Sequence, residues 1–274
     1  MPFKHDSISY GLSQDKYDNS ITKSYCEDLQ CALNLKRKPV GVKLHFTRES
    51  YEKSKLKEPK GKLSYCCVVE KATRGMSFKF RLEHINCDGG TTALGLEPST
   101  NRIESGEEYF SYNLYSSPAV ARRVREGVMG LYRTGVETYG VEVAPLEDLE
   151  IAPDVVIFIV NPYEAMRLQQ GYVYHTGERI VSTTAAMQGI CVEVTVEPYL
   201  TGRMNVSSLC PSTRFLAKWK DEEMSIGIPF EKFKATVEGV IATINTTDLK
   251  ERKEEIIERF KLKNKDADFI HFDK

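Results

Sequence analysis

Residues 153–160 read PDVVIFIV, a run of β-branched and aromatic residues that begins with a proline. Both alternating faces of this run are apolar, which is typical of a strand buried on both sides of a sheet. Residues 39–46, PVGVKLHF, form a second β-rich run that also begins with a proline. We expect these two runs to be equivalent strands, each opening one half of the chain.

A matched pair of cysteines follows each expected strand. The pairs and the residues after them are Cys67 with VVEKATRG, Cys87 with DGGTTALGL, Cys191 with VEVTVEPYLTG and Cys210 with PSTRFLAKW. The intervals are nearly equal, 20 positions in the first pair and 19 in the second. Gly75 and Gly202 end a short helical stretch in each unit, and a short strand leads on to the second cysteine. The sequence therefore predicts an internal repeat.

The expected fold class is α/β, an α+β arrangement with a mixed sheet, packed as one globular unit. The chain has 274 residues, 41% hydrophobic and 28% charged, which is enough to bury a large core. We expect a single domain over residues 1–274, with repeat-like halves at about 28–115 and 150–240. Residues 241–274 should form a charged helix and tail, which either packs across the domain or meets a second subunit of a homo-oligomer.

Charge and hydropathy limit the partners. Lysine and arginine total 38 against 39 acidic residues, for a net charge of −1, so nothing favours binding to nucleic acid or an anionic membrane. The longest apolar run, Val155–Val160, is too short to span a bilayer, and residues 1–12 lack the apolar stretch of a signal peptide. We therefore expect a cytoplasmic protein. Seven cysteines in that reducing compartment argue against a disulfide framework.

Several separated motifs carry a resemblance to a known family. They are residues 39–42 (PVGV), 87–96 (CDGGTTALGL), 153–178 (PDVVIFIVNPYEAMRLQQGYVYHTGE), 199–202 (YLTG) and 224–233 (MSIGIPFEKF). Together, over roughly residues 28–240, the chain resembles the uncharacterised family called domain of unknown function 169. The resemblance implies a shared fold unit and a setting common in anaerobic bacteria and archaea, where cysteines like these recur. It implies no activity.

The thiols carry the chemical hypothesis. Cys87 and Cys210 each precede an expected helix, and a helix amino terminus lowers the pKa of a nearby thiol and favours thiolate. The expected cofactor-binding residues are Gly89 and Gly90, which leave room for a cofactor beside the backbone, and Arg214, which lies close to the second unit and could clamp a carboxylate or phosphate. A four-iron, four-sulfur cluster needs four thiolates. The expected metal ligands are Cys67, Cys87, Cys191 and Cys210, with Cys66 as the alternative to Cys67 in the same turn.

Other interpretations of these residues stay open. No close CxxC pair is present, so the four cysteines are equally compatible with buried structural thiols, and zinc is a smaller alternative. Cys26 and Cys31 are expected in the core as small apolar residues. Further polar candidates are Arg74 and Arg203 as anion clamps, and Tyr172, Tyr174 and His175 as proton donors. His84 lies three positions before Cys87, and on a strand this spacing puts the two side chains on opposite faces, so His84 is not expected as a co-ligand.

The sequence motifs of three common chemistries are absent, those of dinucleotide binding, of a nucleotide-hydrolysing phosphate loop and of a serine nucleophile elbow. The chain has no GxGxxG, GxxxxGK[ST] or GxSxG motif. The leading hypothesis is therefore an iron–sulfur redox or electron-transfer protein of anaerobic metabolism, which meets a redox partner protein or a small-molecule substrate. The alternatives are a metal-free protein that binds a small acidic metabolite, and a cysteine-dependent enzyme with His84 or His175 as its base. Whether the protein is an enzyme, such as an oxidoreductase, stays open.

Overall fold

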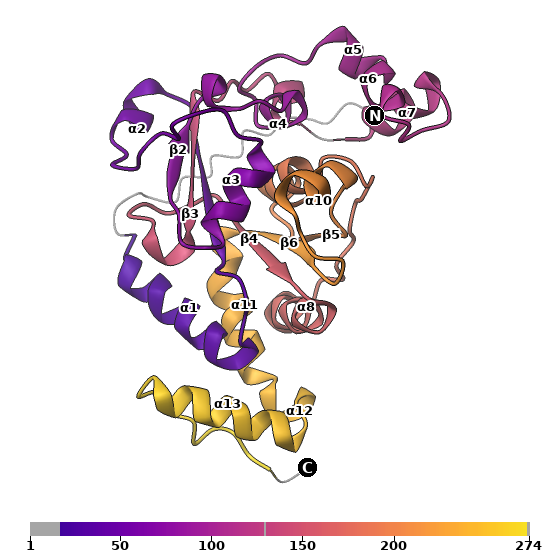
Figure 1. Cartoon of the computed structure of the whole chain (residues 1–274). Coiled ribbons are helices and arrows are strands. Elements are labelled where there is room, and N and C mark those ends of the chain that lie inside the picture. The colour runs from indigo at the N-terminus through magenta and orange to yellow at the C-terminus, as the bar shows by residue number, and fades with distance from the viewer. Residues whose placement is uncertain (1–16, 129, 273–274) are drawn as a thin grey trace.

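The computed structural model describes residues 17–128 and 130–272 and has a mixed helix and strand architecture (Figure 1). Residues 1–12, in which we expect no signal peptide, lie outside the described part. A six-stranded sheet has the order β2-β3-β1-β4-β6-β5, and each neighbouring pair is antiparallel, so the expectation of a mixed sheet is wrong. The strands are β1 (Val40–His45), β2 (Phe78–Phe80), β3 (Gly140–Pro145), β4 (Val155–Val160), β5 (Asn205–Ser207) and β6 (Met224–Pro229).

The two strands expected from the proline-led runs meet at the centre of the sheet. Val40 of β1 is opposite Ile157 of β4, and Val42 is opposite Val155. Outward from this pair, β3 and then β2 follow on one side, and β6 and then β5 follow on the other. Each side of the sheet therefore has a central strand, a second six-residue strand and a three-residue edge strand.

Both faces of β4 are buried, as its apolar sequence predicts. All six of its residues are buried, and successive side chains enter different hydrophobic clusters, because strand residues alternate between faces. Val155 and Ile157 belong to one cluster, whereas Val156 and Phe158 belong to the other. The sheet is thus covered on two sides, and we call the two sides the Ile157 face and the Phe158 face.

Long helices cover the Phe158 face. They are α1 (Asn19–Leu33), α8 (Pro162–Thr176), α11 (Phe230–Ala242) and α13 (Lys250–Leu262), with the short α12 (Ile244–Thr247) between the last two. In Figure 1 these helices fill the lower half of the molecule. The Asn161 side chain accepts a hydrogen bond from the Glu164 N–H, and the Asn161 N–H donates to the Glu164 carboxylate, so a capping box begins α8 directly after β4.

Shorter helices cover the Ile157 face and carry the cysteines of interest. They are α3 (Tyr65–Ala72), α4 (Asp88–Ala93), the π-helix η4 (Gly189–Val196) running into α9 (Glu197–Thr201), and α10 (Pro211–Ala217). The remaining elements are α2 (Arg48–Glu52), η1 (Leu82–His84), α5 (Asn101–Glu104), α6 (Glu107–Ser111), α7 (Pro118–Glu126), η2 (Leu131–Thr134) and η3 (Leu146–Asp148). Among the described helices, none is long and apolar enough to cross a membrane.

The π-helix rests unusually close to the sheet. All eight residues of η4 are buried, and Gly227 of β6 lies directly beneath it. A Cβ atom added at Gly227 would overlap the Val194 carbonyl oxygen and lie 2.7 Å from the Val194 carbonyl carbon. Because backbone atoms cannot move aside as a flexible side chain can, only glycine permits this approach.

We expect Gly227→Ala to destabilise the protein by about 1–3 kcal/mol or more, because the methyl group forces η4 away from the sheet. Urea unfolding followed by circular dichroism measures this change. The matched control is Gly61→Ala, where an added Cβ meets no atom within 4 Å. That control should change stability by no more than about 0.5 kcal/mol. Equal stability of the two variants would contradict the close contact.

The C-terminal helix α13 packs across the domain. Ile256 and Phe260 enter the Phe158-face core, whereas Leu249, the N-cap of the helix, is exposed. The Arg259 guanidinium also donates to the Cys31 carbonyl oxygen at 2.7 Å. Cys31, like Cys26, is buried among apolar residues, which confirms the prediction that both are core residues.

A buried ion pair fixes the turn that leads into α13. Arg167 of α8 is fully buried and donates to the Asp248 carboxylate at 3.1 Å and to the Val240 carbonyl oxygen at 2.7 Å. Asp248 is also buried, so neither charge has water to replace its partner. The pair joins α8 to the end of α11 and to the start of α13.

Replacing one member of this pair should be costly, because the other charge stays buried. We expect Arg167→Leu to lower the free energy of unfolding by about 3–5 kcal/mol. The double variant Arg167→Leu/Asp248→Leu should recover part of that loss, as urea unfolding of both proteins would show. The single variant Asp248→Leu completes the comparison. A loss in the double variant equal to the sum of the losses in Arg167→Leu and Asp248→Leu would contradict the coupling.

Candidate functional site

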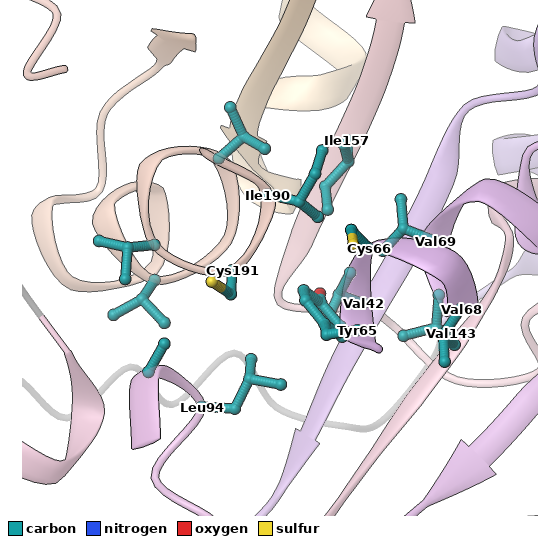
Figure 2. Close-up of a cluster of buried hydrophobic side chains, with 14 of the residues drawn as sticks. Val42, Tyr65, Cys66, Val68, Val69, Leu94, Val143, Ile157, Ile190 and Cys191 are labelled. Atoms are coloured by element: carbon teal, nitrogen blue, oxygen red, sulfur yellow. The ribbon is translucent and has the colours of Figure 1, made fainter. Parts of the chain in front are cut away.

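The Ile157 face contains a cavity of about 350 Å³ whose wall includes four cysteines, Cys66, Cys87, Cys191 and Cys210. Each comes from the start of a different helix: α3, α4, η4 and α10. In Figure 2, Cys66 and Tyr65 at the start of α3 lie across from Cys191 and Ile190 of η4. Cysteines separated by up to 144 positions in the sequence thus border one space.

The start of α3 is tied to the start of α4. Leu63 and Ile85 form an isolated parallel bridge. The Leu63 N–H donates to the His84 carbonyl oxygen at 2.9 Å, and the Asn86 N–H donates to the Leu63 carbonyl oxygen at 3.1 Å. The helix caps follow within one or two residues, Ser64 for α3 and Cys87 for α4, so the bridge sets Cys66 and Cys87 beside the same cavity.

The start of α4 is tied in turn to η4 through Gln188. The Gln188 amide donates to the Gly89 carbonyl oxygen, and its own oxygen accepts from the fully buried Arg125 guanidinium at 3.0 Å. Gln188 caps η4 in the left-handed conformation, with φ of 56°, which is unfavourable for a residue with a Cβ. Two side-chain hydrogen bonds and the buried position hold it there.

Two further contacts join these helices to α10 and so complete a ring of four helices around the cavity. A Cβ added at Gly189 would lie 2.8 Å from the Cys210 nitrogen and 3.0 Å from Leu209 Cα, so glycine allows the start of η4 to touch the start of α10. The Cys67 thiol donates to the Leu216 carbonyl oxygen at 3.4 Å, which ties α3 to α10. The four helices therefore form a closed ring around the cavity, and the sheet supports it from below.

Cys87 and Cys210 occupy the positions that the sequence predicts, as the N-caps of α4 and α10. Cys210 Sγ accepts from the Thr213 N–H at 3.4 Å and lies 2.9 Å from the Thr213 hydroxyl. The expected lowering of the thiol pKa is wrong for Cys87. Burial raises its pKa, and the N–H groups of Gly90 and Gly89 offset that effect only in part.

The other two thiols are also held in the neutral form. Burial raises the pKa of Cys66 to about 12, with smaller increases from neighbouring thiols, while the Ser64 hydroxyl acts in the opposite direction. The pKa of Cys191 is raised well above its ordinary value by burial first and then by Cys87, Cys210 and Cys66. A metal that binds here must displace these protons.

Cys67, the remaining cysteine of the expected ligand set, does not border the cavity. The cavity is bordered by Cys66, the alternative ligand, whereas the Cys67 sulfur points to α10. Arg214 also has other partners, since it donates to the carbonyl oxygens of Ser208, Lys220 and Glu223. It therefore stabilises the loop after α10 and is not among the residues that border the cavity.

Gly89 and Gly90 both border the cavity but have different roles. A Cβ at Gly90 would lie 3.2 Å from the Cβ of Tyr65, so this glycine allows α4 to approach α3. A Cβ at Gly89 would point to the Tyr109 hydroxyl at 3.3 Å and to the Gln188 amide at 3.4 Å. Gly89, unlike Gly90, thus leaves space beside the polar ends of Tyr109 and Gln188.

The other polar candidates lie away from the cavity. His84 accepts from the Arg81 N–H at 3.2 Å and faces Glu58 at 3.5 Å. Arg74 pairs with Glu70 on α3, and Arg203 is exposed. Tyr172, Tyr174 and His175 are on α8, which covers the Phe158 face; Tyr172 is buried there, and the rings of the other two contact each other.

Sequence reasoning missed two buried tyrosines on the cavity wall, Tyr65 and Tyr109. The Tyr65 hydroxyl shares a hydrogen bond of 3.0 Å with the Thr195 hydroxyl. Tyr109 of α6 is 8% exposed. Burial raises the pKa of Tyr109, Arg125 acts in the opposite direction, and the thiols of Cys191, Cys87 and Cys210 raise it further. No periodicity or motif in residues 101–111 indicates this placement, because the helices there are only four and five residues long.

The side chains of the described residues include no group of three or more His, Cys, Asp or Glu arranged to bind a single metal ion. The four thiols instead surround a shared space. They are sulfur-bearing groups around a cavity with Tyr65, Tyr109 and Gln188 on the same wall. This donor set suits a soft, thiophilic group that fills the space between the sulfurs.

Comparison with known proteins identifies the family. Residues 28–239 match the model of DUF169, described as "Uncharacterised ArCR", and the chain belongs to this family. An uncharacterized protein of Methanocaldococcus jannaschii, MJ0308, is 27% identical over 155 residues. That alignment covers 56% of this chain and 65% of the relative, which is less than two thirds of its length. No solved structure matches the chain.

The buried guanidinium behind the cavity gives a test of the ring. Arg125→Leu removes the hydrogen bonds to Gln188 and Tyr132 and the ion pair with Glu104. We expect a loss of about 1.5–3 kcal/mol in unfolding free energy. Arg122→Leu, on the exposed side of the same helix, should change it by no more than about 0.5 kcal/mol. Chemical denaturation measures both, and equal losses would contradict the role of Arg125.

Proposed function

We propose that the cavity holds an iron–sulfur cluster bound by Cys66, Cys87, Cys191 and Cys210, and that the protein acts in redox chemistry or electron transfer. The observation that carries this proposal is the convergence of four thiols, one from each of four helix starts, on one cavity. Four thiolates are what a four-iron, four-sulfur cluster requires. When bound, such a cluster supplies one-electron transfer.

The surroundings of the thiols support a bound group of negative charge. Tyr65 and Cys66 are the first two residues of the eight-residue helix α3, and Ile190 and Cys191 are near the start of the continuous helix Gly189–Thr201. A helix start carries partial positive charge and unpaired N–H groups, which stabilise thiolates and the anionic cluster that they bind. The same effect would offset part of the cost of deprotonating the buried thiols.

The rim of the cavity supports contact with a partner. Asn86, Asp88 and Tyr112 border the cavity and are exposed, so a small molecule or the surface of a redox partner protein has a path to its contents. We place the protein in the cytoplasm of an anaerobic cell, where a cluster near the surface is protected from oxygen.

We further propose that the two halves of the sheet descend from one repeated unit. The strand order is the same in both directions from the β1–β4 pair, and each half supplies one helical cysteine and one N-cap cysteine. β3 would then belong to the first half, although it lies beyond the boundary at residue 115 that the sequence predicts. On this view the cluster lies between the halves and binds two cysteines from each.

The test is anaerobic reconstitution with iron and sulfide. The wild-type protein should bind about four irons and show the broad visible absorption of a cluster. Single serine substitutions at Cys66, Cys87, Cys191 and Cys210 should each reduce the iron content and the absorption strongly, because each removes one of four ligands. The matched control is Cys67→Ser, which changes the adjacent thiol outside the cavity and should retain the full iron content.

Two outcomes would contradict the proposal. A wild-type protein that binds no iron after reconstitution would leave the cavity as a metal-free ligand site. Loss of the cluster in Cys67→Ser together with its retention in Cys66→Ser would make Cys67 the ligand in place of Cys66.

A cysteine-dependent enzyme has less support, because no histidine is among the described residues that border the cavity.

A further inference from the structure

Tyr109 is a large polar side chain on the cavity wall to which the proposed ligand set gives no role. It is 8% exposed and borders the cavity. Its hydroxyl has no hydrogen-bond partner among the described residues, whereas the Tyr65 hydroxyl on the same wall is paired with Thr195. The hydroxyl is not among the fully buried unpaired atoms of the described residues, so it is accessible from the cavity. A donor that faces a cavity without a protein partner is available to a molecule bound there.

The position of Tyr109 is fixed by the backbone. Gly106 caps α6 with φ of 82°, and an added Cβ there would overlap the Arg122 nitrogen and lie 2.9 Å from the Ala121 Cβ. α6 therefore lies tightly against α7, and Figure 1 shows α5, α6 and α7 grouped together at one end of the molecule. The backbone that carries Tyr109 is thus held in place before any ligand binds.

The hydroxyl lies among the thiols. It is near the first turn of α4, 3.3 Å from the point that a Gly89 Cβ would occupy. Cys87, Cys191 and Cys210 are all within electrostatic reach of it. A phenol is neutral at physiological pH and donates one hydrogen bond. The groups that a cluster would bring within its reach are sulfide and thiolate sulfurs, which accept hydrogen bonds.

We propose that the Tyr109 hydroxyl donates a hydrogen bond to a sulfur of the bound cluster or of its cysteine ligands, and that this bond raises the reduction potential. The inference rests on the proposed cluster. Reduction adds negative charge to the sulfurs, so a donor stabilises the reduced form more than the oxidised form. Tyr109 is accordingly a positioning residue that tunes the cluster and is not one of its ligands.

The test compares Tyr109→Phe with Tyr112→Phe. Both residues are on or just after α6 and border the cavity, but Tyr112 is 57% exposed and its hydroxyl already donates to Glu108. The reconstituted proteins are titrated anaerobically and followed by visible absorption. Tyr109→Phe should retain the iron content of the wild type and show a more negative midpoint potential. Tyr112→Phe should match the wild type in both measurements.

The outcomes separate this inference from the function on which it rests. Full iron content with an unchanged midpoint potential in Tyr109→Phe overturns the hydrogen bond and leaves the cluster in place. Loss of iron in Tyr109→Phe also overturns it, because the residue would then serve to hold the site together. A wild-type protein without iron overturns both proposals, and the iron assay alone reveals that case.

Discussion

The antiparallel pairing of β1 with β4 is the constraint on which the rest of the structure depends. Val40, Gly41 and Val42 align with three residues of β4, and this short ladder is the direct link between the two sides of the sheet. Because both strands are buried on both faces, their register fixes which side chains enter each core. A shift by one residue would exchange the Ile157 and Phe158 faces, and because β4 is apolar on both faces, the shapes of its side chains and not their polarity select the register.

The cavity follows from this arrangement. α3 packs on the Ile157 face against β3 and η4 packs there against β4, β5 and β6, and the Tyr65–Thr195 hydrogen bond joins the two helices. α4 and α10 then close the ring, one through Gln188 and the other through Gly189. The Tyr65–Thr195 and Gln188–Gly89 hydrogen bonds join one half of the chain to the other, as does the contact of Cys67 with Leu216, whereas the Gly189 contact lies within the second half. A site that collects thiols from both sides is therefore a consequence of how the two sides meet.

Sequence reasoning located the strands and caps that local patterns determine. The central strands and the N-caps Cys87 and Cys210 follow from apolar runs, prolines and the residues at helix starts. β3 was missed because Glu142 interrupts its apolar pattern, and only the tertiary contact with His45 at 3.1 Å explains why that carboxylate is buried. Tyr109 was missed for a similar reason, since a close backbone contact of Gly106 with α7 places it in the cavity.

The choice between Cys66 and Cys67 shows where local reasoning ends. Adjacent residues on a helix point about 100° apart, so only one of the two thiols can border the cavity. The cap of α3 decides between them: the Ser64 hydroxyl accepts from the Cys67 N–H at 3.4 Å and lies 3.1 Å from Cys66 Sγ. With the first turn fixed in this way, Cys66 borders the cavity and Cys67 meets the Leu216 carbonyl. The adjacent cysteines thus have separate roles, one in the site and one in the ring of helices that encloses it.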